Sequence, residues 1–219
     1  MSRDEQQPPA ERPRGPGRRK AMPDAERRAM IIATALETFI ERGYSGTTTD
    51  NVAARCRISK QTLYAFFPSK TALFVAAVAA HRQMMLDLPR PDEERLPIAE
   101  TLERIFLLDI SDEIERKRST FIHMVMQEAD RFPEIGEVLY REGLMRSLTD
   151  LAEWLATQRS LGRLDIDDPL SGARILMDMI FGGRGAPGPK GRDWMTPEIR
   201  SHHLRRCIAI FARGTAPQT

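Results

Sequence analysis

The chain has 219 residues, of which 41% are hydrophobic and 29% are charged, so it can bury the core of one large domain or two small ones. Its formal net charge of +2 does not by itself indicate an acidic or basic partner. No apolar run reaches the roughly 18 residues that a membrane span needs, and no apolar stretch follows the basic N-terminus as in a signal peptide. We therefore expect a cytoplasmic protein without a membrane partner.

The first 22 residues are rich in proline, glycine, arginine and glutamine, and we expect them to form a disordered basic arm. Residues 12–20 contain five cations and no acid. Basic N-terminal arms of this kind often contact nucleic acid. The alternative is a tail that only improves solubility.

A helix is predicted over residues 24–42. Asp24 and Glu26 place acid in its first turn, where negative charge suits the helix dipole. Apolar residues then recur at three- and four-residue intervals and form one face, at Ile31, Ile32, Ala35, Leu36 and Phe39. Gly43 is a natural end, because glycine adopts a positive φ without penalty.

Three more helices are predicted over about 49–56, 60–66 and 71–86. Threonines at 47–49, Ser59 and Ser69 are suitable N-caps, and Pro68 ends the third helix of the chain. Two short helices joined by a tight turn behind a longer helix are typical of a helix-turn-helix. Such a unit places its second helix in the major groove of DNA.

The stretch from Ile31 to Leu73 resembles the DNA-binding domain of the TetR family. The matching residues are Ala35-Leu36-Glu37, Phe39, Gly43-Tyr44, Thr47-Thr48, Val52-Ala53, Ser59-Lys60, Thr62-Leu63-Tyr64, Phe67, Ser69-Lys70 and Ala72-Leu73. The later chain is similar to the AefR-like branch at Phe121, Glu128-Ala129, residues 131–134, residues 162–164 and Asp168-Pro169.

The resemblance implies an all-α protein that acts as a homodimer. We expect an N-terminal three-helix helix-turn-helix DNA-binding domain over 23–70, a C-terminal helical ligand-binding and dimerisation domain over 71–214, and a tail over 215–219. The implied partners are double-stranded operator DNA, a second copy of the chain and a small-molecule effector.

The resemblance also assigns DNA-contacting positions. Threonines and serines at helix N-termini, a phenol and an ammonium group suit phosphate oxygens, and the matching candidates are Thr47, Thr48, Ser59, Tyr64 and Lys70. Arg57 departs from the family pattern and is a further candidate because it adds a cation near the DNA backbone. Base reading is expected from Lys60, Gln61 and Thr62, with Gln61 pairing with adenine. Arg18, Arg19 and Lys20 of the arm are candidates for the minor groove.

Three of these positions have alternative interpretations. Tyr64 could be a half-buried core aromatic, and Ser59 could be a helix cap only. Arg57 stands where the family usually has glycine, so a positive φ there would cost about 1 kcal/mol of strain.

The second half of the chain predicts helices over about 97–111, 116–130, 134–161, 168–182 and 196–212, and no strand pattern occurs. Methionine and aromatic side chains on these helices are candidates for a pocket that binds an apolar or aromatic ligand, namely Met84, Phe106, Phe121, Met124, Met145, Trp154 and Met177. The alternative is that they are ordinary core residues.

By resemblance, the last two helices form the dimer interface as an intermolecular four-helix bundle. Their apolar stripes contain Ala173, Leu176, Ile180, Leu204, Ile208 and Phe211. The alternative is that these stripes bury the core of the single chain.

The sequence contains no Gly-rich phosphate loop, His-Glu-x-x-His or Gly-x-Ser-x-Gly motif, and Cys56 and Cys207 have no metal-ligand spacing. We therefore expect no enzymatic activity, cofactor or metal. The sequence favours a ligand-responsive transcriptional repressor that binds a palindromic operator. A non-specific architectural DNA-binding protein is the alternative, and a helical enzyme or carrier would have no affinity for DNA.

Overall fold

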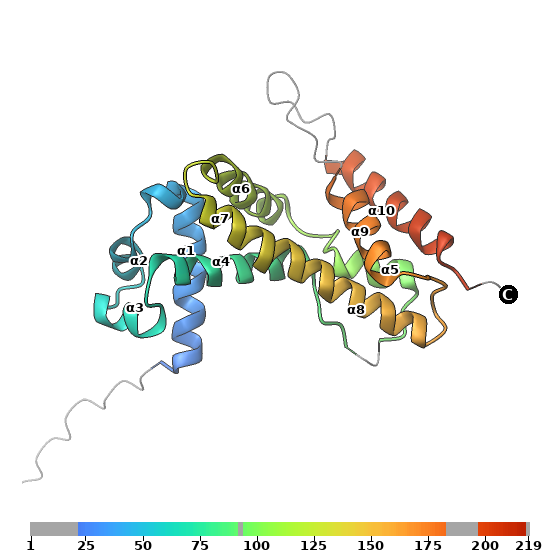
Figure 1. Ribbon diagram of the computed structural model, residues 1–219, viewed down its shortest axis with the longest axis horizontal. Helices are drawn as coiled ribbons and strands as arrows, with labels where there is room; N and C mark the ends of the chain where they lie inside the picture. Colours follow the sequence, from blue (N-terminus) through green and yellow to red (C-terminus); the bar gives the residue numbers. More distant parts are fainter. Residues whose placement is uncertain (1–21, 92–93, 183–196, 218–219) are drawn as a thin grey trace, which may run out of the picture.

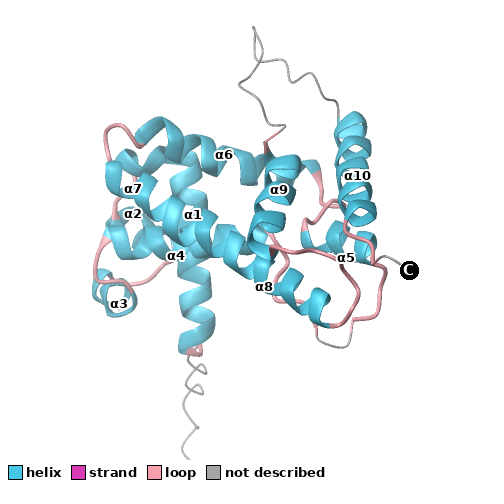
Figure 2. Cartoon of the chain, turned by 45° about the vertical axis from the view of Figure 1, so that its right-hand side comes forward, coloured by secondary structure: helices cyan, strands magenta, loops and turns pink. Residues whose placement is uncertain are grey.

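A computed structural model describes residues 22–91, 94–182 and 197–217. All regular secondary structure in these ranges is helical, as predicted (Figure 2). Arg18, Arg19 and Lys20 of the predicted arm lie outside the described residues.

Most of the described helices begin and end close to the positions that the sequence predicts, but the helix predicted over 97–111 ends at Ile105, because Leu107 takes a non-helical φ of 52°. The described helices are α1 Asp24–Gly46, α2 Thr49–Arg55, α3 Lys60–Phe66, α4 Lys70–Met85, α5 Ile98–Ile105, α6 Asp112–Glu128, α7 Pro133–Val138, η1 Leu139–Met145, α8 Arg146–Ser160, α9 Pro169–Phe181 and α10 Pro197–Gly214. None of them is by itself long and apolar enough to cross a membrane; α3 and α4 meet that test only together, bent by 62°.

Gly43 breaks α1 where the sequence predicts its end. Its φ of 72° and ψ of 172° are not helical, and one further turn follows before Thr47. The glycine therefore separates the straight part of α1 from a short turn that leads into α2.

The helix predicted over 134–161 is a continuous run that contains an unpredicted π-helical segment, η1. A π turn holds more residues than an α turn, so it changes the direction in which the following side chains point. Ile135 and Val138 before η1 are buried in one core, whereas Leu148, Leu151 and Leu155 after it are buried in another. The π segment thus lets one helical run serve two cores.

The first core joins α1–α4 to α6 and α7. Phe74 of α4 lies at its centre, with ring centroids 5.2 Å from Phe39, 5.2 Å from Tyr44 and 5.9 Å from Phe121. This core crosses the domain boundary predicted at residue 70, and that boundary stays a prediction. The aromatic cluster joins α1 to α4 and α6, and the helix-turn-helix packs into the same core through Val52, Ala53 and Leu63.

The second core joins α5, α8, α9 and α10 at the opposite end of the molecule (Figure 1). It corrects the predicted dimer interface. Five of the six residues assigned to that interface are buried inside the single chain, at Ala173, Leu176, Ile180, Ile208 and Phe211, and Leu204 packs partly buried against them. The apolar stripes of α9 and α10 face their own chain, because α5 and α8 need apolar partners.

Candidate nucleic-acid interface

Helices α2 and α3 form a helix-turn-helix at the end of the molecule farthest from α10 (Figure 1). Thr48 caps α2 by accepting a hydrogen bond from the Asn51 backbone N–H at 3.1 Å, while the Asn51 side chain accepts from the Thr48 N–H at 3.3 Å. Ser59 caps α3 by accepting from the Thr62 N–H at 3.0 Å. These caps set where each helix begins, so they also set which side chains stand at the start of α3.

The turn between the two helices depends on Arg57. The Ile58 N–H donates to the Ala53 carbonyl at 3.1 Å, and Arg57 takes a φ of 55° to allow this closure. The strained conformation considered from the sequence is therefore present, at a cost of about 1 kcal/mol relative to glycine. The same geometry leaves the Arg57 side chain exposed beside α3.

The predicted base-reading residues lie together at the start of α3. Lys60 and Gln61 are exposed and Thr62 is partly exposed. Tyr64, one turn further along, is 41% exposed and its hydroxyl lies 3.1 Å from the Thr49 hydroxyl. The structure thus leaves the Tyr64 phenol at the surface, within reach of an external partner.

Lys60 forms an ion pair with Asp50 of α2, with Nζ 2.8 Å from a carboxylate oxygen. The hydrogen bond with Asp50 raises the pKa of the Lys60 ammonium above its ordinary value. Exposed pairs of this kind contribute little to stability, because water and salt screen the two charges. Lys60 can therefore exchange Asp50 for an acceptor on another molecule at little cost.

Thr47 does not belong to the exposed set, which corrects the sequence-based assignment. Its side chain is 1% exposed, and its hydroxyl donates to the Gly43 carbonyl at 2.7 Å and the Thr38 carbonyl at 3.2 Å. A threonine next to a helix start can cap that helix, donate a hydrogen bond to another molecule or donate one to the preceding turn. Here the Thr47 hydroxyl donates to carbonyls of α1 and so stabilises the end of that helix.

Lys70, at the start of α4, lies against the core. Its Nζ is 4.1 Å from the centre of the Tyr44 ring, and burial lowers the pKa of its ammonium. Contact of Lys70 with phosphate stays a prediction.

A carboxylate from α6 holds the end of α1, and the sequence-based reasoning did not identify this role. Glu128 accepts hydrogen bonds from the backbone N–H groups of Tyr44, at 2.9 Å, and Ser45, at 2.8 Å. A Cβ at Gly43 would collide with the same carboxylate. Gly43 is thus needed both for its positive φ and for the approach of Glu128, but from the sequence it indicated only a helix end.

The methionine and aromatic side chains predicted to line one ligand pocket do not meet around one cavity. Phe121 and Met124 are buried in the first core, whereas Phe106 and Met177 are buried in the second. Met84 and Met145 pack partly buried against the first and the second core, respectively. Met124 lines an open hollow between α1 and α6, and Trp154 lines a different one beside α8. The core interpretation therefore accounts for most of this set.

Two family models, one for each half of the chain, together match most of its length. Residues 31–77 match bacterial regulatory proteins of the tetR family, and residues 110–214 match the C-terminal domain of AefR-like transcriptional repressors.

Two curated relatives align with part of the chain. The transcriptional activator FasR of Mycolicibacterium smegmatis is 39% identical over 71 residues, which is 32% of each chain. The regulator RutR of Escherichia coli K12 is 37% identical over 62 residues, 28% of this chain and 29% of RutR. The alignments thus span about a third of the length of these relatives.

Solved structures align over most of the chain. The flavonoid-responsive regulator FrrA is 28% identical with a TM-score of 0.61, over 89% of this chain and 100% of FrrA. A TetR-family regulator from Rhodococcus sp. is 20% identical with a TM-score of 0.67, over 85% of this chain and 98% of that one, and shows the shared fold.

The contact of Glu128 with the end of α1 yields a prediction. Replacing Glu128 with alanine should lower the free energy of unfolding by about 1–3 kcal/mol, because two backbone donors lose a charged acceptor. Amide hydrogen exchange followed by NMR should show faster exchange at Tyr44 and Ser45. Glu113→Ala, which removes an exposed carboxylate from the same helix, should leave both amides protected. Equal protection in the Glu128 variant would contradict the role assigned to this carboxylate.

Proposed function

Because this chain belongs to the TetR family of transcriptional regulators, which bind DNA, we propose that it is a cytoplasmic, homodimeric repressor that a small molecule releases from a palindromic operator. The observation that carries the proposal is the exposed start of α3, where Lys60, Gln61 and Thr62 lie. Ser59 caps this helix, and Thr48 caps the preceding helix α2. Repression, rather than activation, is supported by the match of residues 110–214 to AefR-like repressors.

Roles in DNA binding follow from side-chain chemistry. Gln61 can pair with adenine through two hydrogen bonds, Lys60 can donate to guanine acceptors, and the Thr62 methyl can contact a thymine methyl. Hydroxyls and cations around them would contact phosphate and so position the protein without reading sequence. These are Thr48, Arg57, Ser59, Tyr64 and Lys70, with Arg18, Arg19 and Lys20 of the arm proposed for the adjacent minor groove.

Control by a ligand requires a physical connection between the two cores. The helical run α7–η1–α8 supports such a connection, because it carries buried residues of both cores. Within the first core, Glu128 of α6 and Phe74 of α4 contact α1, which leads into the helix-turn-helix. A ligand that prefers one position of α4 or α6 would change the spacing of the two α3 helices in a dimer, and so the affinity for DNA. FrrA, a structural relative, is described as flavonoid-responsive, which supports an aromatic effector.

We propose that a second copy packs against the outer faces of α9 and α10. These faces carry aliphatic side chains that the single chain leaves about half exposed, at Leu170, Ile175, Ile199 and Ile210. Symmetric dimers suit half-sites that are one helical turn of DNA apart. The proposal uses residues outside the stripes assigned from sequence.

The proposed function is tested by selecting genomic DNA fragments with the purified protein. We expect enrichment of an inverted repeat with two equivalent half-sites. Binding of all fragments with equal affinity would instead establish the architectural alternative, and absence of binding would exclude both.

Gln61 should carry sequence preference. Gln61→Ala is expected to reduce discrimination at one base pair of each half-site by about 1–3 kcal/mol, measured by fluorescence anisotropy with operators changed one position at a time. Arg57→Ala is the control: it should weaken binding to all sequences alike and lower the salt slope by about one. An unchanged preference in the Gln61 variant would remove this residue from the reading set.

The proposed dimer interface predicts that charged substitutions on it lower the molecular mass measured in solution. Ile175→Glu combined with Ile210→Glu should convert the dimer to a monomer in light scattering after size exclusion, because four charges would be buried at a symmetric interface. Ile114→Glu, at a 40% exposed position on α6, should remain dimeric. A dimer that survives the double substitution would place the interface elsewhere.

A further inference from the structure

A pocket of about 660 Å³ lies between the C-terminal end of α4, the segment that follows it, α5 and α8. Its walls include Arg82 of α4, Thr101 of α5 and residues of α8 from Asp150 to Gln158. This volume is within the range of pockets that bind drug-sized molecules.

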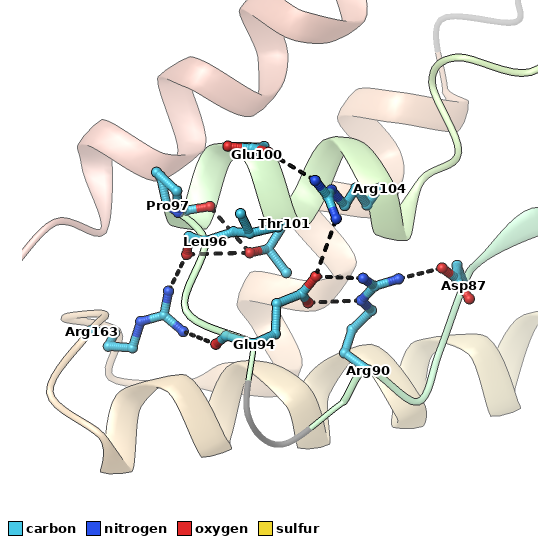
Figure 3. Close-up of polar contacts among 9 residues, drawn as sticks. All are labelled: Asp87, Arg90, Glu94, Leu96, Pro97, Glu100, Thr101, Arg104 and Arg163. Carbon is cyan, nitrogen blue, oxygen red and sulfur yellow. Dashed lines mark hydrogen bonds and ion pairs between the residues drawn. The ribbon is translucent and has the colours of Figure 1, made fainter.

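The charged side chains of the pocket neutralise one another (Figure 3). Arg90 and Glu94 each have side chains only 11% exposed, and two hydrogen bonds, of 2.8 and 2.5 Å, join them. The hydrogen bond with Arg90 lowers the pKa of Glu94, and Asp87 adds a second carboxylate to Arg90. Both groups of the central pair are therefore charged and compensated.

The other charges are compensated as well. Arg163 donates to the Leu96 carbonyl and, at 2.7 Å, to the Gln158 side-chain oxygen. Arg82 pairs with Asp150. Glu153 is exposed and so is hydrated. Because no buried charge of the pocket lacks a counter-charge or acceptor, a charged occupant would bury its charge without compensation.

Two hydrogen-bond donors of the pocket have no acceptor. Gln158 is 7% exposed and its oxygen is used by Arg163, but no described residue accepts from its amide NH₂. The Arg82 Nε–H also lacks an acceptor among the described residues, but it is fully buried and so is closed to an occupant. The Gln158 NH₂ is not among the fully buried unsatisfied atoms, so an occupant that brings an acceptor oxygen can reach it.

The remaining wall is apolar. It includes Leu88, Pro89, Pro91, Leu161 and the indole of Trp154. Aromatic rings stack against such a surface more favourably than flexible chains, because few rotamers are lost. The apolar wall and the free donor of Gln158 thus select for the same kind of molecule.

We infer that this pocket binds the effector, and that the effector is an uncharged, planar aromatic molecule with carbonyl or hydroxyl oxygens. The ring system packs against Trp154 and Pro89, and an oxygen accepts from Gln158. The inference rests on the proposed function for its regulatory meaning, whereas the binding itself does not depend on DNA. Occupation would act on α4 through Arg82, which lies on the helix that follows α3 directly.

Isothermal titration of the full chain without DNA tests the pocket. The probes are four uncharged aromatics (flavone, coumarin, genistein and daidzein, the last two below their first pKa), with 2-naphthoate as a planar anion and proflavine as a planar cation. We expect at least one uncharged probe to bind at one site per chain, and the charged probes to bind at least tenfold more weakly.

Two variants and a control locate the site. Gln158→Glu keeps an acceptor for Arg163 but removes the free donor, so it should weaken the affinity for the uncharged probe by about tenfold. Trp154→Ala should abolish binding. Tyr140→Ala removes a 57% exposed aromatic from the same helical run outside the pocket and should bind as the parent chain does. Circular dichroism melting confirms that each variant is folded.

Several results would overturn the inference: no binding by any uncharged probe, equal binding of a charged probe, or binding that neither Gln158→Glu nor Trp154→Ala weakens. Enrichment of an inverted repeat from genomic DNA is measured without any probe. If the chain selects an operator but binds none of the uncharged probes, the pocket is refuted and the DNA-binding proposal stands. If it binds a probe but selects no operator, the DNA-binding proposal is refuted and the pocket stands.

Discussion

The hydrogen bonds from Tyr44 and Ser45 to the carboxylate of Glu128 are the constraint on which the rest of the structure depends. They join the last turn of α1 to α6 across more than eighty residues of sequence. Because α2 and α3 follow that turn directly, their position relative to the C-terminal half is set where α6 ends. The aromatic cluster around Phe74 provides the apolar part of the same connection. The DNA-binding unit and the helices behind it therefore share one core.

The local parts of this fold were predictable because their signals are local. Thr48, Ser59 and Ser69 are caps within three residues of the groups they bind, and α2 and α3 begin where these caps predict. Glu128 has no such neighbour in sequence: Gly43 indicated only a helix end, and the close approach of the carboxylate became visible in the structure. Thr47 shows the limit of residue type as evidence, since one hydroxyl suits a phosphate or a carbonyl equally well.

The interface and the pocket were harder to predict for a related reason. An apolar stripe such as Leu176 and Ile208 shows that a helix is buried, but not in whose core. Likewise, arginines and carboxylates scattered between residues 82 and 163 show no convergence in sequence. In space Arg90 and Glu94 neutralise each other, and what remains available to a ligand is an amide, an indole and two prolines. The groups that a ligand can contact therefore depend on which charges pair in the folded chain, and the sequence does not show these pairs.

The ion pair between Lys60 and Asp50 has a consequence for how this protein would search a genome. The lysine at the start of α3 already has an anionic partner on its own chain, so every duplex must displace that partner before it gains the lysine. A duplex that offers only phosphate exchanges one anion for another and also brings Asp50 close to its backbone. A duplex with a correctly placed base acceptor gains hydrogen bonds that the carboxylate cannot mimic. In the proposed complex with DNA, Asp50 would in this sense be an intramolecular competitor for Lys60.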